Sequence, residues 1–236
     1  MVSHSRIIMK KIIFELSKLS VSPPENLEMV ISYFSSKDKI TFFSWKMFDI
    51  NLDRNRQPVF NNTFNIIDAK KFINRELLFL KLLKKYNVSF EYIKIIPDDL
   101  PVYFYQIKNK SASVFSKNVE NFFRQFYPQT KVFLFTDFIK NKKLQKLYDK
   151  IFEDVYKNRY FDKIELDKEV KLRSNKDIAA RAFALFAAES AILYELSKKT
   201  FPNLILLAGE RSLNTYKYEF YKCPKNRPVL PKLFVI

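Results

Sequence analysis

The sequence predicts an α/β protein in which a mostly parallel sheet is flanked by helices. Short apolar segments of strand length alternate with longer segments of helical periodicity, a pattern typical of strands joined by crossover helices. Neither a repeat nor a Gly/Ser linker divides the 236 residues, of which 47% are hydrophobic. We therefore expect one domain over residues 1–236, with an N-terminal extension over 1–25 and a Pro-containing C-terminal strap over 222–236.

The first third of the chain predicts a strand, an ambiguous apolar segment, a loop and a helix. Residues 29–34 indicate a short buried strand that follows two prolines. Residues 39–48 are compatible with either a strand or a helix. The polar stretch 51–62 indicates a loop. Residues 68–86 predict a helix, because the apolar side chains of this segment recur on one face. Asp68 is a suitable N-cap for it.

The rest of the chain alternates in the same way. The predicted elements are, in order, strand 88–96, a helix from Ser111 or Ser113 to about residue 127, strand 131–138, helix 142–160, an Ala-rich helix 175–199, strand 203–207 and an extended segment 215–221. The alanines allow another element to pack closely against helix 175–199, and we expect the two long helices to cover one flank of the sheet.

Parallel sheets of this kind bind ligands at the carboxyl ends of their strands. Three segments follow predicted strands and are candidates for that edge. They are residues 32–36, the pair Thr136 and Asp137, and residues 210–219.

The composition excludes most catalytic repertoires. The chain has one His, one Cys and one Gly, which are His4, Cys223 and Gly209. A Ser-His-Asp relay needs an imidazole beside the nucleophile, a zinc site needs several Cys, His or carboxylate ligands, and phosphate-binding loops need several glycines. Any chemistry must therefore use Ser, Tyr, Asp, Glu, Lys or Arg, and we expect no metal.

The charge indicates the partner. Forty-two Lys and Arg against 25 Asp and Glu leave a net charge of +17, which favours a polyanion. A composition bias toward Lys, Asn, Ile and Phe is the alternative explanation for part of this excess. No apolar run is long enough to cross a membrane, and the first residues lack a cleavable signal. A single Cys is consistent with the cytoplasm.

Several segments, taken in order, resemble the tRNA-dependent cyclodipeptide synthases. A Val30-Ile31-Ser32 segment stands where that family has Gly-Ile-Ser, and a basic helix follows it. The resemblance covers roughly residues 29–221. In chain order, the further matches are a strand end (Phe135-Thr136-Asp137-Phe138), the long helix after it, the helix segment 188–196, Pro202, the strand 204–207 and the Tyr-containing segment Thr215-Tyr216-Lys217-Tyr218-Glu219.

The resemblance implies a single Rossmann-like domain similar to the catalytic domain of class I tyrosyl-type aminoacyl-tRNA synthetases. It also implies that two aminoacyl-tRNAs are joined into a cyclic dipeptide, a diketopiperazine, with no cofactor. Ser32 would attack the aminoacyl ester and hold the first amino acid as an acyl-enzyme. Because the substrate is already activated, this aminoacyltransferase would need neither ATP nor a metal.

Other roles carry over from the same resemblance. Tyr216 would line the acyl site, and Glu195 would bind the substrate ammonium. The family's helix Tyr corresponds to Ala191 here, so Ser190 and Tyr194 are the alternatives, and Val30 replaces a family Gly. The predicted substrate-binding residues are Ser35, Lys217, Glu219, Glu189 (which competes with Glu195 for the ammonium) and Asp137, although Asp137 is also a suitable helix N-cap.

Basic residues on helix 68–86 would bind the phosphates of aminoacyl-tRNA. They are Lys70, Lys71, Arg75, Lys81, Lys84 and Lys85. A second candidate patch comprises Lys140, Lys142, Lys143 and Lys146. The rival hypotheses are a non-catalytic RNA-binding protein on the same scaffold, favoured by Ala191 and Val30, and a structural protein whose charge reflects composition alone.

Overall fold

The protein folds around an all-parallel sheet. The computed structural model describes residues 11–15, 18, 27–36, 38–45, 66–98, 110–128, 130–158, 166–167, 170–171, 175–208 and 232–234. The five-stranded sheet has the order β3-β2-β1-β4-β5, and each neighbouring pair is parallel. The strands are β1 (Ile40–Trp45), β2 (Phe90–Ile96), β3 (Lys131–Leu134), β4 (Leu204–Ala208) and β5 (Lys232–Phe234). The predicted Rossmann-like α/β fold is confirmed.

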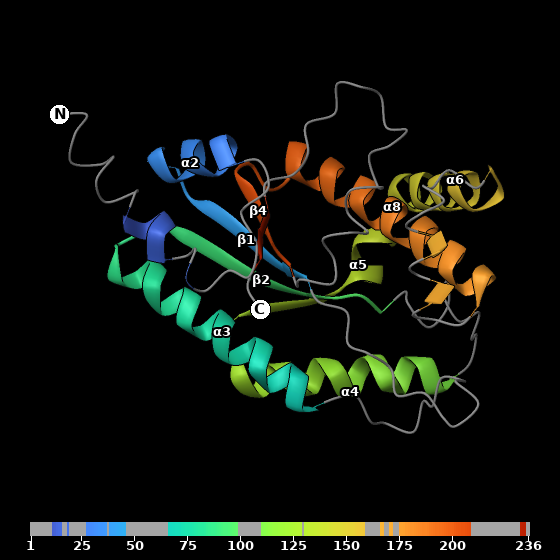
Figure 1. Cartoon of the computed structure of the whole chain (residues 1–236), viewed down its shortest axis with the longest axis horizontal. Coiled ribbons are helices and arrows are strands. Elements are labelled where there is room, and N and C mark those ends of the chain that lie inside the picture. The colour runs from blue at the N-terminus through green and yellow to red at the C-terminus, as the bar shows by residue number, and fades with distance from the viewer. Residues whose placement is uncertain are drawn as a thin grey trace.

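Helices cover both faces of this sheet (Figure 1). On one face lie α3 (Ile66–Lys85) and α4 (Lys110–Phe126), and on the other lies α8 (Lys176–Lys199) with α6 (Lys142–Asn158) packed on its outer side. The expectation that two long helices share one flank is therefore confirmed. The shorter helices are α2 (Leu27–Ser35) and α5 (Phe135–Ile139).

The predicted strand 29–34 is wrong, because this segment belongs to the helix α2. A short apolar run satisfies both periodicities, so length and neighbours decide between them. Here Leu27, Val30 and Phe34 recur at helical spacing, and Val30 is fully buried. Glu28 in the first turn also favours the helix, since a carboxylate there complements the helix dipole.

Two further strand boundaries are settled by the structure. The ambiguous segment 39–48 contributes β1, which is buried along its whole length at the centre of the sheet. The predicted strand 131–138 is too long, since β3 ends at Leu134 and α5 begins at Phe135. A side-chain oxygen of Asp137 accepts a hydrogen bond from the Leu134 N–H at 3.3 Å, which favours turning the chain into a helix at this point.

The other predicted elements within the described ranges are confirmed, with boundaries that shift by a few residues. The expected helix starts are wrong, because α3 begins at Ile66 and α4 at Lys110, which places Asp68, Ser111 and Ser113 inside these helices. Asn175 caps α8, and its side chain accepts hydrogen bonds from the N–H groups of Asp177 and Ile178. The loop 51–62 and the extended segment 215–221 lie outside the described residues. Within the predicted C-terminal strap, residues 232–234 form the edge strand β5 beside β4.

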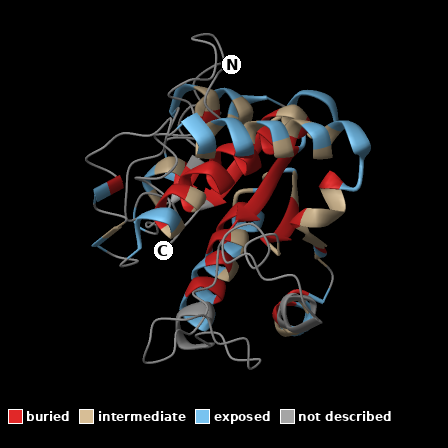
Figure 2. Ribbon diagram, turned by 90° about the vertical axis from the view of Figure 1, so that its right-hand side faces the viewer, coloured by how far each residue is buried: buried red, intermediate tan, exposed pale blue. Residues whose placement is uncertain are grey.

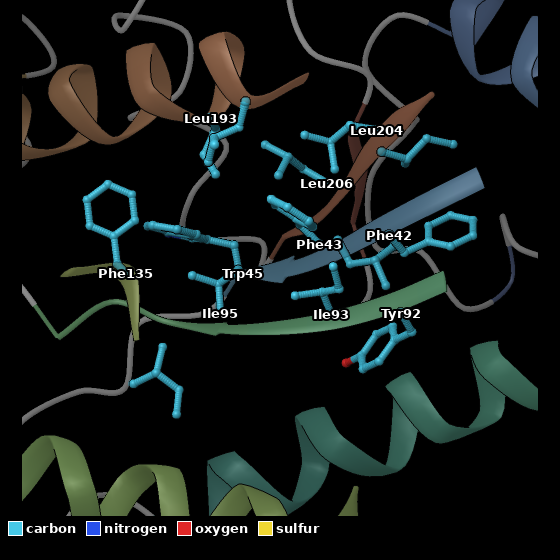
Figure 3. Close-up of a cluster of buried hydrophobic side chains, with 14 of the residues drawn as sticks. Phe42, Phe43, Trp45, Tyr92, Ile93, Ile95, Phe135, Leu193, Leu204 and Leu206 are labelled. Atoms are coloured by element: carbon cyan, nitrogen blue, oxygen red, sulfur yellow. The ribbon is translucent and has the colours of Figure 1, made fainter. Parts of the chain in front are cut away.

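Side chains of β1 alternate between the two faces of the sheet. Phe43 and Trp45 pack against Phe201 and Phe135 on the side of α8, whereas Phe42 packs edge-on against Phe79 of α3. Figure 3 shows Trp45 and Phe135 together at the carboxyl end of β1, with Leu193 of α8 above them. The carboxyl edge of the sheet is thus lined by aromatic side chains on one face.

Candidate functional site

Asp98 joins the carboxyl ends of two neighbouring strands. It follows β2, and its carboxylate accepts hydrogen bonds from the backbone N–H of Thr136 at 2.9 Å and from the Thr136 hydroxyl. Burial raises the pKa of Asp98, while the two Thr136 donors act in the opposite direction. This half-buried carboxyl group is a polar feature at the edge where sheets of this class bind ligands.

Trp45 lies at the same edge, at the end of β1. Its ring meets that of Phe135 edge-on with 5.1 Å between centroids, and Phe135 in turn contacts Tyr148 of α6. The side chain of Trp45 is only 2% exposed, and its indole N–H finds no hydrogen-bond acceptor among the described residues. These rings belong to the hydrophobic core beneath the carboxyl edge, and the indole N–H is a buried polar atom among them.

On the opposite face of the sheet, the structure assembles a buried polar cluster that the sequence analysis missed. We call it the Lys94 cluster, and it comprises Ser44, Glu76, Lys94 and Tyr127. Lys94 Nζ lies 2.6 Å from Ser44 Oγ and 3.2 Å from Glu76 Oε2, and both charged side chains are fully buried. The Tyr127 hydroxyl donates to Glu76 Oε2 at 2.6 Å, and the Ser44 hydroxyl donates to Oε1.

The surroundings of the Lys94 cluster are aromatic. The Lys94 ammonium lies 4.4 Å from the ring centroid of Phe72 and 4.5 Å from that of Phe123. Burial raises the pKa of Tyr127 and of the neighbouring Tyr92, and the charge of Glu76 adds to both shifts. Both phenols therefore stay protonated at neutral pH, where Tyr127 acts as a donor to the carboxylate.

A sequence signal for this cluster exists. Lys94 interrupts the apolar strand Phe90–Ile96, and Glu76 interrupts the apolar stripe of α3. Charged residues at core positions are rarely buried unless they are paired. Two opposite charges at such positions, on consecutive elements of a β-α-β order, predict a buried pair.

Ser32 does not lie at the carboxyl edge. It is exposed on α2, which leads into the amino end of β1, and Ser35 is exposed one turn later with its hydroxyl donating to the Ile31 carbonyl at 2.8 Å. The expectation that residues 32–36 follow a strand and join Thr136 at the ligand-binding edge is therefore wrong. The nucleophilic role of Ser32 stays a prediction.

The predicted residues of α8 differ in burial. Glu189 and Ser190 are 1% and 3% exposed, and Tyr194 is also buried, with the Lys198 ammonium 4.2 Å from its ring centroid. Glu195 is partly exposed, and its carboxylate oxygens lie 3.9 Å from the ammonium groups of Lys198 and Lys199. No hydrogen bond joins Glu195 to Ser32 in the described structure, and ion pairs with exposed lysines are weak.

Asp137 holds a structural position at the start of α5. Besides accepting from Leu134, it pairs with Lys140, which raises the pKa of that lysine. The remaining predicted residues, Tyr216, Lys217 and Glu219, lie outside the described residues.

Basic residues line two helices on opposite sides of the sheet. All six predicted cations of α3 are exposed, and one of them, Lys85, pairs with Glu15 at 3.6 Å. On α6, four exposed lysines occupy the first half of the helix: Lys142, Lys143, Lys146 and Lys150. Both surfaces have the charge that a polyanion requires.

Two classes of feature are not found in the described ranges. No group of three or more His, Cys, Asp and Glu side chains there is arranged to hold a metal ion. Each helix there is too short or too polar to cross a lipid bilayer.

The arrangement defines a Rossmann-like α/β protein with the fold of the tyrosyl-type synthetases. Comparison with solved structures finds tyrosyl-tRNA synthetase from Archaeoglobus fulgidus, complexed with L-tyrosine, at a TM-score of 0.61 and 8% identity, covering 96% of this chain and 64% of that one. Tryptophanyl-tRNA synthetase from Encephalitozoon cuniculi, bound to tryptophan, gives a TM-score of 0.55 and 10% identity, covering 100% of this chain and 65% of that one.

A tryptophanyl-tRNA synthetase homolog from Entamoeba histolytica gives a TM-score of 0.53 at 14% identity, covering 96% of this chain and 59% of that one. The chain thus spans less than two thirds of the length of these three structures. No protein-family model and no curated protein sequence matches it. At these identities the likeness concerns the fold.

Proposed function

We propose that this chain binds aminoacyl-tRNA and transfers its aminoacyl group. The observation that carries the proposal is the synthetase-type fold, whose similarity to tyrosyl-tRNA synthetase covers 96% of the chain. The net charge of +17 suits an RNA ligand, because Lys and Arg contacts to phosphates supply most of the affinity for nucleic acids. Such a substrate would place the protein in the cytoplasm.

The finer proposal is cyclodipeptide synthesis. Ser32 Oγ would attack the ester carbonyl of one aminoacyl-tRNA, forming a serine ester and releasing the terminal ribose hydroxyl of the tRNA, which takes up the serine proton. The amine of a second aminoacyl-tRNA would displace Ser32 from this ester, and the dipeptidyl group would then return to Ser32 with release of the second tRNA. The free amine of this dipeptidyl-enzyme would attack the serine ester, closing the ring and freeing the Ser32 hydroxyl. The last step is intramolecular, which lowers its entropic barrier. Exposure of Ser32 on α2 supports access by so large a substrate.

The second candidate is non-catalytic binding of tRNA or another RNA on the same scaffold. It is favoured by the positions of the predicted catalytic residues. Ser32 lies on a helix before β1, away from the carboxyl edge, and Glu195 sits beside two lysines.

One experiment separates the two candidates. The chain and its Ser32→Ala variant are expressed in a bacterial host, the medium is searched for cyclic dipeptides by mass spectrometry, and binding of purified protein to bulk tRNA is measured. A diketopiperazine that disappears in the variant supports cyclodipeptide synthesis through Ser32. A product that persists in the variant contradicts the role of Ser32. Folded protein that binds tRNA without forming product supports the second candidate, and protein that does neither refutes both.

A further inference from the structure

We infer that the first half of α6 is a docking surface for the phosphate backbone of RNA. We call this surface the α6 lysine face and define it as Lys142, Lys143, Lys146 and Lys150. The inference deepens the proposed function and rests on it. It assigns the main RNA contact to α6. The sequence instead predicts this contact on α3, which lies on the opposite side of the sheet.

The α6 lysine face is exposed and electrostatically unbalanced. Its four lysines are exposed, and none of them forms an ion pair with a residue of the described part of the chain. Lys140, just before the helix, pairs with Asp137, and Lys157, near its end, pairs with Glu153. Among the described residues, the lysines that flank the face are therefore ion-paired and the four lysines of the face are not, with Asp149 the one carboxylate between Lys142 and Lys150.

The placement of these lysines opposes the helix dipole. The positive end of a helix favours carboxylates, yet the first turn of α6 has no acidic residue and begins with Lys142 and Lys143. Like charges four residues apart, such as Lys142, Lys146 and Lys150, also repel each other. A bound polyanion would offset both the unfavourable interaction with the helix dipole and the repulsion between the lysines.

The geometry of α6 suits one nucleic-acid strand. By helical periodicity the four lysines fall within about 100° of arc, and they span roughly 12 Å along the helix axis. The α6 helix packs on α8, and most residues of α8 are buried. The side of α6 that faces away from α8 is exposed (Figure 2). A compact exposed row of cations can contact several successive phosphates of one strand without rearrangement.

Its location also suits the proposed substrate. Because α6 follows β3 and the short helix α5, its first turn starts near the carboxyl edge that Asp98 and Thr136 define. By contrast, the predicted cations of α3 are spread from Lys70 to Lys85, roughly 22 Å along the axis. They therefore extend from one edge of the sheet toward the other, so only some of them lie near the carboxyl edge.

The test measures tRNA affinity as a function of salt. Fluorescence anisotropy with labelled bulk tRNA compares the wild type with a K142Q/K143Q/K146Q/K150Q variant. The matched control is K11Q/K117Q/K171Q/K176Q, which removes the same charge from exposed lysines elsewhere. We expect the α6 variant to bind at least about tenfold more weakly than the control. Its salt slope should be shallower by roughly 0.7 to 0.9 for each lysine that contacts a phosphate.

Two further variants complete the test. Replacing the four α6 lysines by arginine keeps the charge and should keep wild-type affinity, whereas a loss there would contradict an electrostatic contact. If K70Q/K71Q/K81Q/K84Q loses affinity and the α6 variant matches the control, α3 is the RNA surface and the inference is overturned, while the proposed function stands. If the wild type binds anionic vesicles but not tRNA, both the inference and the proposed function are overturned.

Discussion

The helices α8 and α3 cover opposite faces of the same sheet, and they differ in what they bury. Most of α8 consists of small and apolar side chains, and seven of its buried residues are alanines, although Glu189 and Ser190 are buried there as well. Against the other face, α3 buries Glu76, which meets Lys94 and Ser44 of the sheet and Tyr127 after α4. The α8 helix is therefore packed mainly through small and apolar side chains, whereas α3 combines apolar packing with a buried, hydrogen-bonded ion pair.

This difference indicates how each helix is positioned. Apolar packing tolerates many substitutions of similar volume. It therefore restricts the distance between α8 and the sheet more than the rotation of α8 about its own axis. A buried ion pair is directional and becomes unfavourable when either partner is lost. The Lys94 cluster should accordingly fix which side of α3 faces the sheet, and with it the direction in which the α3 cations point.

The largest expected effect comes from Lys94→Met. Removing the ammonium leaves the fully buried Glu76 carboxylate without its counter-charge, so the free energy of unfolding should fall by about 3–5 kcal/mol. Urea denaturation followed by circular dichroism measures the change. The matched control is Lys131→Met on β3, whose partner Glu91 lies at the surface, and we expect a loss of at most about 1 kcal/mol there.

The double variant Lys94→Met/Glu76→Gln sharpens this test. Because it removes both charges, it should be more stable than Lys94→Met alone. Equal stability of the single and double variants would show that lost packing, rather than the unpaired charge, accounts for the effect.

A smaller loss is expected for Tyr127→Phe. The variant keeps the ring but removes the hydroxyl that donates to Glu76 at 2.6 Å, and a hydrogen bond to a charged group contributes about 1.5–3 kcal/mol. The same denaturation measurement applies. The control is Tyr156→Phe on α6, where the hydroxyl is bonded to the exposed Asp177, and its loss should be smaller. Equal losses would argue against a special role for the buried cluster.

On the α8 face, Ala188→Leu should destabilise the protein by about 1–3 kcal/mol. Ala188 is fully buried, so a larger side chain has to displace its neighbours. Ala188→Gly serves as the comparison, since it costs roughly 1 kcal/mol of helix propensity without adding volume. If thermal denaturation shows the leucine to be tolerated better than the glycine, packing around α8 is looser than the structure indicates.

The smallest effect is expected for Asp98→Asn at the carboxyl edge, and it depends on pH. The pKa of Asp98 is raised in the folded state, so its contribution to stability is largest at low pH and is lost as the pH rises through the folded pKa. The wild type should therefore gain stability relative to the variant as the pH is lowered from 7 toward 4. Unfolding free energies at several pH values test this, and an opposite trend would show that the Thr136 hydrogen bonds outweigh burial.

Much of the fold could be predicted because long segments express a single periodicity. The apolar stripe of α3, the alanines of α8 and the apolar run of β2 each predict their element, and the alternation of strands with helices predicts a parallel sheet. Short segments could not be predicted in the same way. Residues 29–34 suit a strand or a helix, and only the tertiary packing of Val30 and its neighbours selects the helix.

The candidate site shows the same division. Three features follow from the residue order alone: the basic charge, the lack of His, Cys and Gly for common catalytic sites, and the Thr136-Asp137 turn after a strand. The folded arrangement is needed to show that Asp98 contacts Thr136, that Ser32 lies away from them, and that Lys94 and Glu76 are buried together. The physical reason is that composition and periodicity act locally, whereas the partner of a side chain depends on strand order and helix placement, which long-range packing sets.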